Sequence, residues 1–315
     1  MPSPVFSIIV PVHNRAHIIH ECLVSILAQT LGDFEIIVVD NNSTDNFDEI
    51  LRTFADSRVI VTRCPTPGPS AARMHGVSLS KGKYLSFIDS DDVWRNDVLE
   101  QVAKSLESQD RPVAVYLSTV IFRPDLPVDW NSKPTARAVM AVDLIDALWK
   151  GAPGACALAG VHRNLFEDGK GFAEELWVGE DVDWAMRNAS AGPVSLLLDE
   201  PRLGYRRHDE NITKDSGRYA AWAHELLEFA TNAPGRYAIT GNPSLRKYIV
   251  THLMGQLQTI LRMRSFASFL RIYPRVLLLG LRWRVLRPLW MPSLFASYFE
   301  NRAKVLKATS LTGKT

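Results

Sequence analysis

The sequence predicts an α/β protein: a mostly parallel sheet flanked by helices, followed by an α-helical C-terminal region. Three strand-then-helix units follow one another within about sixty residues, an order that builds parallel sheets with crossover helices. The predicted strands are apolar at successive positions, so both faces of the sheet need cover. Strand patterns then stop, and the chain becomes basic. We therefore expect two parts, residues 1–215 and residues 216–315.

The N-terminal elements follow from the spacing of apolar residues. Continuous apolar runs indicate buried strands, and apolar residues at three- and four-residue spacing indicate amphipathic helices. Strands are expected at residues 5–10, 34–39, 58–62 and 84–89, and helices at residues 16–29, 45–54, 71–80 and 98–106. The loop at residues 64–70 is too rich in Pro and Gly for regular structure, and Ser70 is the expected N-cap of the next helix.

The second half of the predicted sheet is more irregular. Further strands are expected at residues 112–122, 156–161, 193–198 and 203–208, a short helix at 143–150, a helical turn at 163–166 and a helix opening at Glu180. Residues 123–141 hold three prolines among polar residues, which favours a long surface connection. The C-terminal segments with helical character are residues 219–229, 244–264 and 266–290.

Composition is typical of a globular protein, with 46% hydrophobic and 22% charged residues in a chain of 315. Three cysteines, an odd number without a Cys-x-x-Cys pair, favour neither a disulfide framework nor a zinc site. The first residues lack the basic segment of a signal peptide, so we expect a cytoplasmic protein without an N-terminal anchor.

Residues 84–92 form the stretch around which the chain is organised. An apolar run ends abruptly on Asp89, Asp91 and Asp92, and open α/β sheets bind ligands where their strands end. Three acids repel one another unless a positive charge lies among them, and a divalent cation that carries phosphate oxygens is the usual occupant. The structural alternative is that residues 90–92 cap the following helix.

Two later clusters carry further polar chemistry. Glu180, Asp181 and Asp183 open a helix, where the macrodipole stabilises anions, and simple helix-end electrostatics is the alternative explanation. The last predicted strand ends on Arg206, Arg207 and His208. Side chains alternate along a strand, so at most one of the two arginines needs to face a site. His208 is a candidate metal ligand, phosphate donor or surface residue.

Six short motifs, in one order along residues 5–213, closely resemble the family-2 glycosyltransferases of the GT-A fold. The motifs are Ile-Val-Pro-Val-His-Asn-Arg (9–15), Val-Val-Asp-Asn-Asn-Ser-Thr-Asp (38–45), Ser-Ala-Ala-Arg (70–73), Phe-Ile-Asp-Ser-Asp-Asp-Val-Trp (87–94), Gly-Glu-Asp-Val-Asp-Trp (179–184) and Tyr-Arg-Arg-His (205–208). Each motif alone is weakly specific, whereas six at suitable spacing are strongly specific.

The resemblance implies a nucleotide-sugar site with a divalent metal, Mn²⁺ or Mg²⁺. The implied donor-binding residues are Pro11, Val12, His13, Asn14, Arg15, Asp40, Arg73, Asp89, Ser90, Asp91 and Arg207. The loop after the first strand and Asp40 match positions that hold the base and ribose of a nucleoside diphosphate, and Arg73 matches a side chain that reaches toward the nucleotide. The implied metal ligands are Asp91, Asp92 and His208, and the choice between the two acids as main ligand stays open.

Asp181 matches the acid that serves as general base in these enzymes, with Glu180 beside it. The implied reaction inverts the anomeric carbon and moves a sugar from a nucleotide-diphosphate sugar, with uridine preferred by resemblance, to a hydroxyl of a glycan. Two alternatives are a sugar-nucleotide nucleotidyltransferase and a non-catalytic nucleotide-sugar-binding scaffold. The first would need a Gly-rich loop after the first strand, and residues 11–15 contain no Gly.

The C-terminal part is strongly basic. From Leu245 onward there are 13 Lys and Arg against the single acid Glu300, whereas the preceding residues hold 23 basic and 33 acidic side chains. Residues 266–290 interleave Arg with aromatic and aliphatic residues but contain no run long enough to span a bilayer. We expect residues 245–300 to contact a membrane surface peripherally, which suits a lipid-linked glycan acceptor and polysaccharide biosynthesis at the cell envelope. Packing on the catalytic domain or in a homo-oligomer is the alternative, and without a recognition motif we expect no nucleic-acid partner.

Overall fold

The structure, a computed structural model, describes residues 3–47, 54–123, 127–130, 139–150, 152, 154–208, 216–232, 236–237, 239, 242–262 and 265–285. The chain divides into two compact units, residues 1–211 and residues 212–315. Most of the helix expected at residues 45–54 and the end of the segment expected at residues 266–290 lie outside the described residues.

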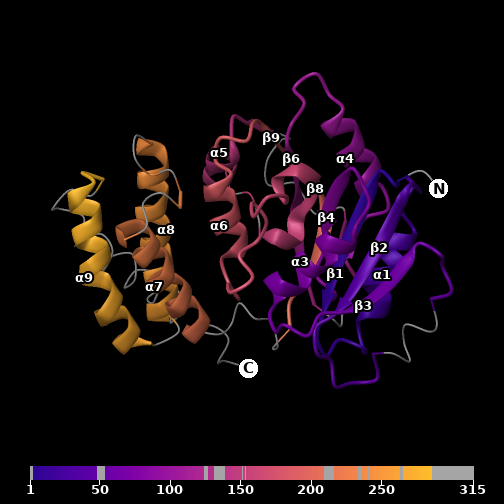
Figure 1. The fold of residues 1–315 in the computed structure, drawn as a ribbon, viewed down its shortest axis with the longest axis horizontal. Coiled ribbons are helices and arrows are strands. Elements are labelled where there is room, and N and C mark those ends of the chain that lie inside the picture. Colours follow the sequence, from indigo (N-terminus) through magenta and orange to yellow (C-terminus); the bar gives the residue numbers. More distant parts are fainter. Residues whose placement is uncertain are drawn as a thin grey trace, which may run out of the picture. The chain divides into compact units, whose positions relative to one another are not determined.

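The first unit is built on one mixed sheet (Figure 1). Its strands are β1 (Phe6–Val12), β2 (Phe34–Asp40), β3 (Val59–Arg63), β4 (Tyr84–Phe87), β5 (Val93–Trp94), β6 (Ala114–Phe122), β7 (Val139–Ala141), β8 (Leu158–His162) and β9 (Val194–Arg206). They lie in the order β3-β2-β1-β4-β8-β6-β9-β5, and β7 also pairs with β9. The predicted fold class is confirmed, with parallel strands from β3 to β4 and mixed directions beyond β4.

Parallel pairing brings the ends of three strands to one edge. The register pairs Ile9 of β1 with Phe87 of β4, and Val12 of β1 with Asp40 of β2. The loops that follow β1, β2 and β4 therefore leave the sheet together, with Asp40 at the end of β2 and Asp89, Asp91 and Asp92 after β4.

Helices cover both faces of the sheet, as the apolar strands predict. Alternate residues of β1 point to opposite sides: Ile8 belongs to the hydrophobic cluster that includes residues of α1 (Ile19–Leu27) and α4 (Val98–Leu106), whereas Ile9 belongs to the cluster that includes residues of α3 (Pro69–Leu79), α5 (Leu144–Trp149) and α6 (Glu180–Arg187). This period-two alternation in a buried, mostly apolar strand is what a layered α/β/α core requires.

The predicted strands at residues 193–198 and 203–208 are one strand, β9. Asp199, Glu200 and Pro201 resemble a turn in sequence, but β6 continues beside them through two register shifts around Ser118. The Ser118 hydroxyl donates to the carbonyl of Glu200 at 2.6 Å, which accommodates the irregularity. Tertiary pairing thus overrides the local turn signal.

Three further boundaries differ from the sequence-based expectation. The helix α3 has Gly68 as its N-cap and Pro69 in its first turn, while the Ser70 hydroxyl donates to the carbonyl of Leu176 at 2.5 Å instead of capping. Residues 155–157 form a single 3₁₀ turn before β8, so the strand expected to start at Cys156 starts at Leu158. No strand was predicted at β5 or at β7, and both pair with β9; β7 lies within residues 123–141, which were expected to form a surface connection.

The second unit contains three described helices, α7 (Ser216–Asn232), α8 (Pro243–Arg262) and α9 (Phe266–Arg282). One face of α9, with Ile272, Val276 and Leu279, is buried, and α9 contacts both α7 and α8. Among the residues that the structure describes, no helix is both long enough and apolar enough to cross a membrane.

Candidate active site

The loop after β1 is tied to the loop after β2. Asn14 adopts a left-handed backbone conformation with φ of 52°, which Asn tolerates better than most residues. Its backbone N–H donates to the Ser43 hydroxyl at 3.1 Å, and its side-chain oxygen accepts from the N–H of Thr44 at 2.8 Å. His13 Nδ1 lies 2.8 Å from the carbonyl oxygen of Asn41. These contacts hold residues 13–15 against the end of β2.

Asp40, at the end of β2, is 2% exposed. One carboxylate oxygen accepts from the N–H of Ser43 at 2.9 Å, and the other lies 3.0 Å from Arg63 Nε. Pro11 and Val12 lie in β1 beside this acid, because the register pairs Val12 with Asp40. The predicted base-and-ribose residues thus occupy one corner of the sheet edge.

Arg73 links two of the predicted acids. Its guanidinium donates to Glu180 Oε1 at 2.7 Å and to Asp89 Oδ1 at 2.6 Å, and its side chain is 5% exposed. Burial alone would lower the pKa of Arg73, but the two carboxylates raise it above its ordinary value, so the guanidinium stays charged. Arg73 therefore ties the loop after β4 to the start of α6.

The start of α6 is fixed by packing. Gly179, its N-cap, has φ of 81°, a conformation that glycine adopts without strain. Trp184 is fully buried and stacks on Phe166 with ring centroids 5.3 Å apart. Asp183, also fully buried, pairs with Arg187 at 2.7 Å, so this acid serves the structure of the helix. Glu180 and Asp181 consequently sit on a rigid support.

The pKa values of Glu180 and Asp181 are both raised. Burial raises the pKa of Glu180 to about 7, with Arg73 acting in the opposite direction. Burial also raises the pKa of Asp181, although its Oδ1 accepts the N–H of Val182 at 2.8 Å. A Cβ added at Gly154 would lie 3.0 Å from Asp181 Oδ2, so the chain passes close beside this carboxylate. A carboxyl with a raised pKa beside a glycine-lined approach is suited to proton transfer.

Asp91 lies with His208 and Arg15. His208 Nε2 is 2.9 Å and Arg15 Nε is 3.6 Å from Asp91 Oδ2, and the three side chains are each 15% exposed. The structure therefore joins the end of the Asp-x-Asp motif to the end of β9 and to the loop after β1.

Asp92 has a different environment from its neighbour. It is fully buried, and its Oδ1 accepts the N–H of Arg206 at 2.9 Å. Its Oδ2 is buried without a hydrogen-bond partner. Burial, followed by the charges of Asp91 and Asp89, raises the pKa of Asp92 well above its ordinary value. The three predicted metal ligands thus divide into an Asp91–His208 pair and a separate Asp92.

Arg206, which is not among the site residues implied by the resemblance, lies nearer the acids than Arg207 does. It is 3% exposed, donates from Nε to the carbonyl of Asp91 at 2.8 Å and reaches Glu21 at 2.6 Å. Arg207 is exposed, and its backbone N–H donates to the carbonyl of Phe122. Ser90, between the two acids of the motif, is buried.

The donor set fits a divalent cation. Asp91 and His208 offer an oxygen and an imidazole nitrogen, ligands that suit Mn²⁺. Among the described residues, the group of three acidic, thiol or imidazole side chains with ligand atoms mutually within 4.8 Å is Asp89, Asp92 and Cys156. Cys156 was not predicted as a site residue, because its separation in sequence from residues 89–92 gives no signal.

The parallel sheet edge, its acid-bearing segments and the acidic opening of α6 make up the candidate site. Residues 7–168, about half of the chain, match the model of glycosyl transferase family 2. The chain belongs to this family.

Relatives agree with this assignment. The chain is 37% identical over 279 residues to "Uncharacterized glycosyltransferase EpsJ" of Bacillus subtilis, covering 81% of this chain and 77% of the relative. It is 36% identical over 116 residues to "Glycosyltransferase GlyG" of Streptococcus pneumoniae, covering 36% of this chain and 38% of the relative. The match therefore spans well under half of GlyG.

Solved structures share the fold. TarS 1–349 of S. aureus in complex with UDP-GlcNAc aligns with a TM-score of 0.57 and 20% identity, covering 86% of this chain and 90% of that one. The same TarS fragment in complex with UDP aligns with a TM-score of 0.55 and 19% identity, covering 86% and 89%. At this identity the likeness is one of fold.

Proposed function

We propose that this glycosyltransferase inverts the anomeric carbon of a nucleotide-diphosphate sugar, with UDP as the carrier, and delivers the sugar to a hydroxyl of a glycan or lipid-linked glycan. The observation that carries the proposal is the Asp89–Arg73–Glu180 bridge. It ties the loop that bears the Asp-x-Asp motif to the helix that bears Asp181, so a donor group and a base group belong to one rigid assembly. The TarS neighbour with bound UDP-GlcNAc supports the choice of carrier.

The donor side consists of residues 11–15, Asp40 and the residues around Asp91. The loop after β1 and Asp40 hold the base and ribose, and Arg15 and His208 orient Asp91. Asp91 and His208 would hold a divalent Mn²⁺ or Mg²⁺, and that ion would supply positive charge for the leaving diphosphate. Arg206 fixes the backbone of Asp91 and so keeps this carboxylate in place.

The acceptor side depends on Asp181. Glu180 is committed to Arg73 at 2.7 Å and positions the helix, so we assign the base role to Asp181. Its carboxylate takes the proton of the acceptor hydroxyl as that oxygen attacks the face of the sugar opposite the leaving diphosphate. An α-linked donor would thus give a β-linked product.

The test replaces Asp181 by Asn. We expect turnover to fall by about 10²–10⁴-fold because the amide cannot accept the proton. Binding of UDP in the presence of Mn²⁺, measured by calorimetry, should stay within about threefold, because the change lies on the acceptor side. Exposed Glu174→Gln is the matched control and should leave both quantities unchanged.

Turnover by Asp181→Asn within about tenfold of the unchanged protein would remove Asp181 from the base role. A scaffold, in contrast, would bind UDP yet show no slow hydrolysis of UDP-sugars without acceptor. A nucleotidyltransferase would release pyrophosphate from a nucleoside triphosphate and a sugar phosphate.

The exposed face of α9 supports peripheral membrane contact. Phe266, Leu270 and Leu278 are 55%, 70% and 66% exposed, and Leu281 follows at helical spacing. Arg271 and Arg282 are exposed on the same helix. An apolar strip with basic neighbours suits a lipid surface with anionic headgroups.

Co-sedimentation with anionic liposomes tests this contact. The double variant Leu270→Ser/Leu278→Ser should lower the bound fraction by at least about threefold, because it removes apolar area that enters the interface. Leu79→Ser, which changes a leucine 42% exposed on α3, is the control and should not alter binding. Equal sedimentation of all three proteins would favour a partner subunit or no contact.

A further inference from the structure

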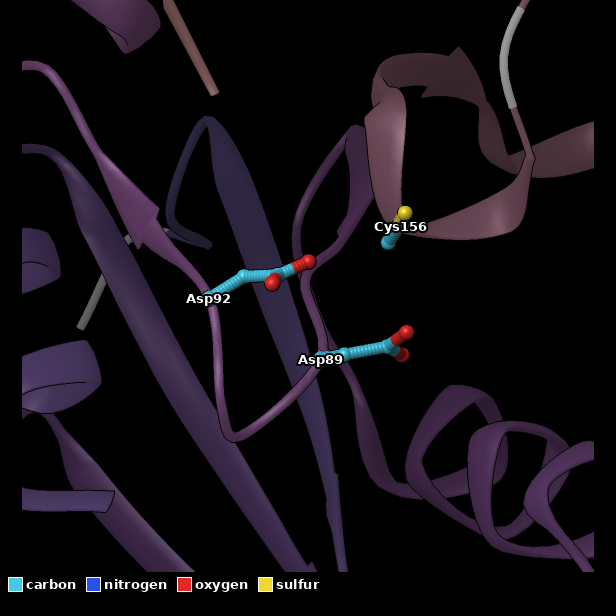
Figure 2. A group of neighbouring side chains, drawn as sticks. All are labelled: Asp89, Asp92 and Cys156. Carbon is cyan, nitrogen blue, oxygen red and sulfur yellow. The ribbon is translucent and has the colours of Figure 1, made fainter. Parts of the chain in front are cut away.

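Asp89, Asp92 and Cys156 come from two separate segments and lie next to one another (Figure 2). Two of the ligand atoms are carboxylate oxygens, the third is the Cys156 sulfur, and all three lie within 4.8 Å of one another. Asp89 and Cys156 are partly exposed, whereas Asp92 is fully buried. The group is thus open to solvent on one side and closed behind Asp92.

This arrangement is unfavourable without a positive charge inside it. Asp92 Oδ2 is buried without a hydrogen-bond partner, and burying an unsatisfied polar atom is unfavourable. Arg73 satisfies one oxygen of Asp89, and Arg206 reaches Asp92 through its backbone N–H. Neither arginine is hydrogen-bonded to the partnerless oxygen, so a small cation among the three groups would satisfy it.

We propose that Asp89, Asp92 and Cys156 form a second cation site that selects a thiophilic divalent ion such as Zn²⁺ over Mn²⁺ or Mg²⁺. A thiolate with two carboxylates is a ligand set that zinc accepts and that magnesium avoids. The site differs from the Asp91–His208 pair, which offers oxygen and nitrogen only. On binding, the Cys156 thiol releases its proton to solvent and the thiolate sulfur coordinates the ion.

Occupation of this site has a consequence for the transfer reaction. Asp89 is held by Arg73 at 2.6 Å, and a cation competes with that guanidinium for the same carboxylate. The inferred ion therefore acts as an inhibitor that loosens the bridge between the donor loop and α6. This last step rests on the proposed function, whereas the binding itself does not.

The direct test uses Co²⁺, whose bond to a thiolate gives an intense charge-transfer absorption in the near ultraviolet. The band should appear on titration of the full chain and of Cys22→Ser/Cys64→Ser, which leaves Cys156 as the remaining cysteine. It should be lost in Cys156→Ser, with Zn²⁺ affinity lowered by at least about tenfold. Absence of the band, or its persistence in Cys156→Ser, would overturn the site.

A second measurement needs no variant. Zn²⁺ or Cd²⁺ should slow the alkylation of Cys156 by iodoacetamide by at least about tenfold. Mass spectrometry of the peptide that contains Cys156 measures the extent of alkylation. Mg²⁺ at the same concentration serves as the control and should not protect. Equal alkylation with and without Zn²⁺ would contradict the proposal.

These readouts separate the inference from the proposed function. Asp181→Asn should keep the cobalt band while it loses turnover, because it does not remove a ligand of the second site. A chain that binds cobalt but transfers no sugar would refute the proposed function alone, and a chain that transfers sugar without a cobalt band would refute the second site alone.

Discussion

The two units of the chain bury titratable side chains in opposite ways. At the sheet edge Arg73 is buried and charged, because Asp89 and Glu180 pair with it. In the second unit His252 is half-buried and neutral, with Trp222 Nε1–H donating to its Nε2 at 3.2 Å, and desolvation lowers its pKa to about 4. Burying an unpaired charge is costly. Among the described residues, the fully buried charge of Arg73 is therefore paired in the first unit, and such charge is absent from the helical core of the second.

The largest effect is expected from removing the charge at the sheet edge. Arg73→Ala should lower the free energy of unfolding of the first unit by about 3–5 kcal/mol, because it leaves the buried carboxylate of Glu180 and the partly exposed carboxylate of Asp89 without their partner. Denaturant titration at pH 7 measures this. Arg63→Ala, which removes an arginine 69% exposed from a 3.0 Å pair with Asp40, should cost less than about 1 kcal/mol. Equal losses in the two variants would mean that burial does not set the strength of these pairs.

An intermediate effect is expected from charging the neutral imidazole. The unfolded chain binds a proton at His252 near pH 6.5, whereas the folded chain does so only near pH 4. Stability of the second unit should therefore fall as pH drops from about 6.5 to 4, by up to about 3 kcal/mol. Protonation places a hydrogen on the nitrogen that faces the indole N–H of Trp222.

Hydrogen exchange of α7 and α8 amides across this pH range measures the loss. His252→Gln should flatten the dependence, whereas His17→Gln, an exposed histidine in the first unit, should leave it unchanged. A second unit that is equally protected at pH 6.5 and pH 4.5 would show that His252 is not held as a neutral group.

The smallest effect is expected at a surface pair. Hydrogen bonds from Arg58 lower the pKa of Asp56 to about 2, so its contribution is present above pH 4 and is lost as pH falls toward 2. Both side chains are 31% exposed, and solvent screening limits the contribution to less than about 1 kcal/mol. Thermal unfolding at pH 7 should show that Asp56→Asn is less stable than the unchanged chain by this small contribution only. Lowering the pH of the unchanged chain to 2.5 should remove the same contribution. A loss comparable to that of Arg73→Ala would contradict the ranking.

The sequence predicted the parallel strands and the acids at their ends because both signals are local. Apolar runs of β-branched residues specify β1 and β2, and Asp40 and Asp89 follow such runs directly. The continuity of β9 could not be predicted, since it depends on β6 lying beside Pro201. For the same reason the partners of Arg73 could not be predicted: Glu180 lies 107 residues away in the chain.

Adjacent residues were also hard to tell apart by sequence. Asp91 and Asp92 look alike in the motif, yet one faces His208 and the other is buried under Arg206. Arg206 and Arg207 likewise take the reverse of the expected positions. Alternation along a strand means that their side chains point to opposite faces, but it does not say which of the two points inward. Such choices depend on the register of β9 against its neighbours.

The guanidinium of Arg73 makes two acids share one cation. A ligand that draws Asp89 away from Arg73 leaves the guanidinium to interact more strongly with Glu180. Binding events at the two ends of the bridge are therefore energetically coupled. Reciprocity of binding free energies then requires that whatever occupies the acceptor side change donor affinity by the same factor as the donor changes acceptor affinity. Coupling between the donor and acceptor sides would follow from one shared side chain, with no movement of the fold.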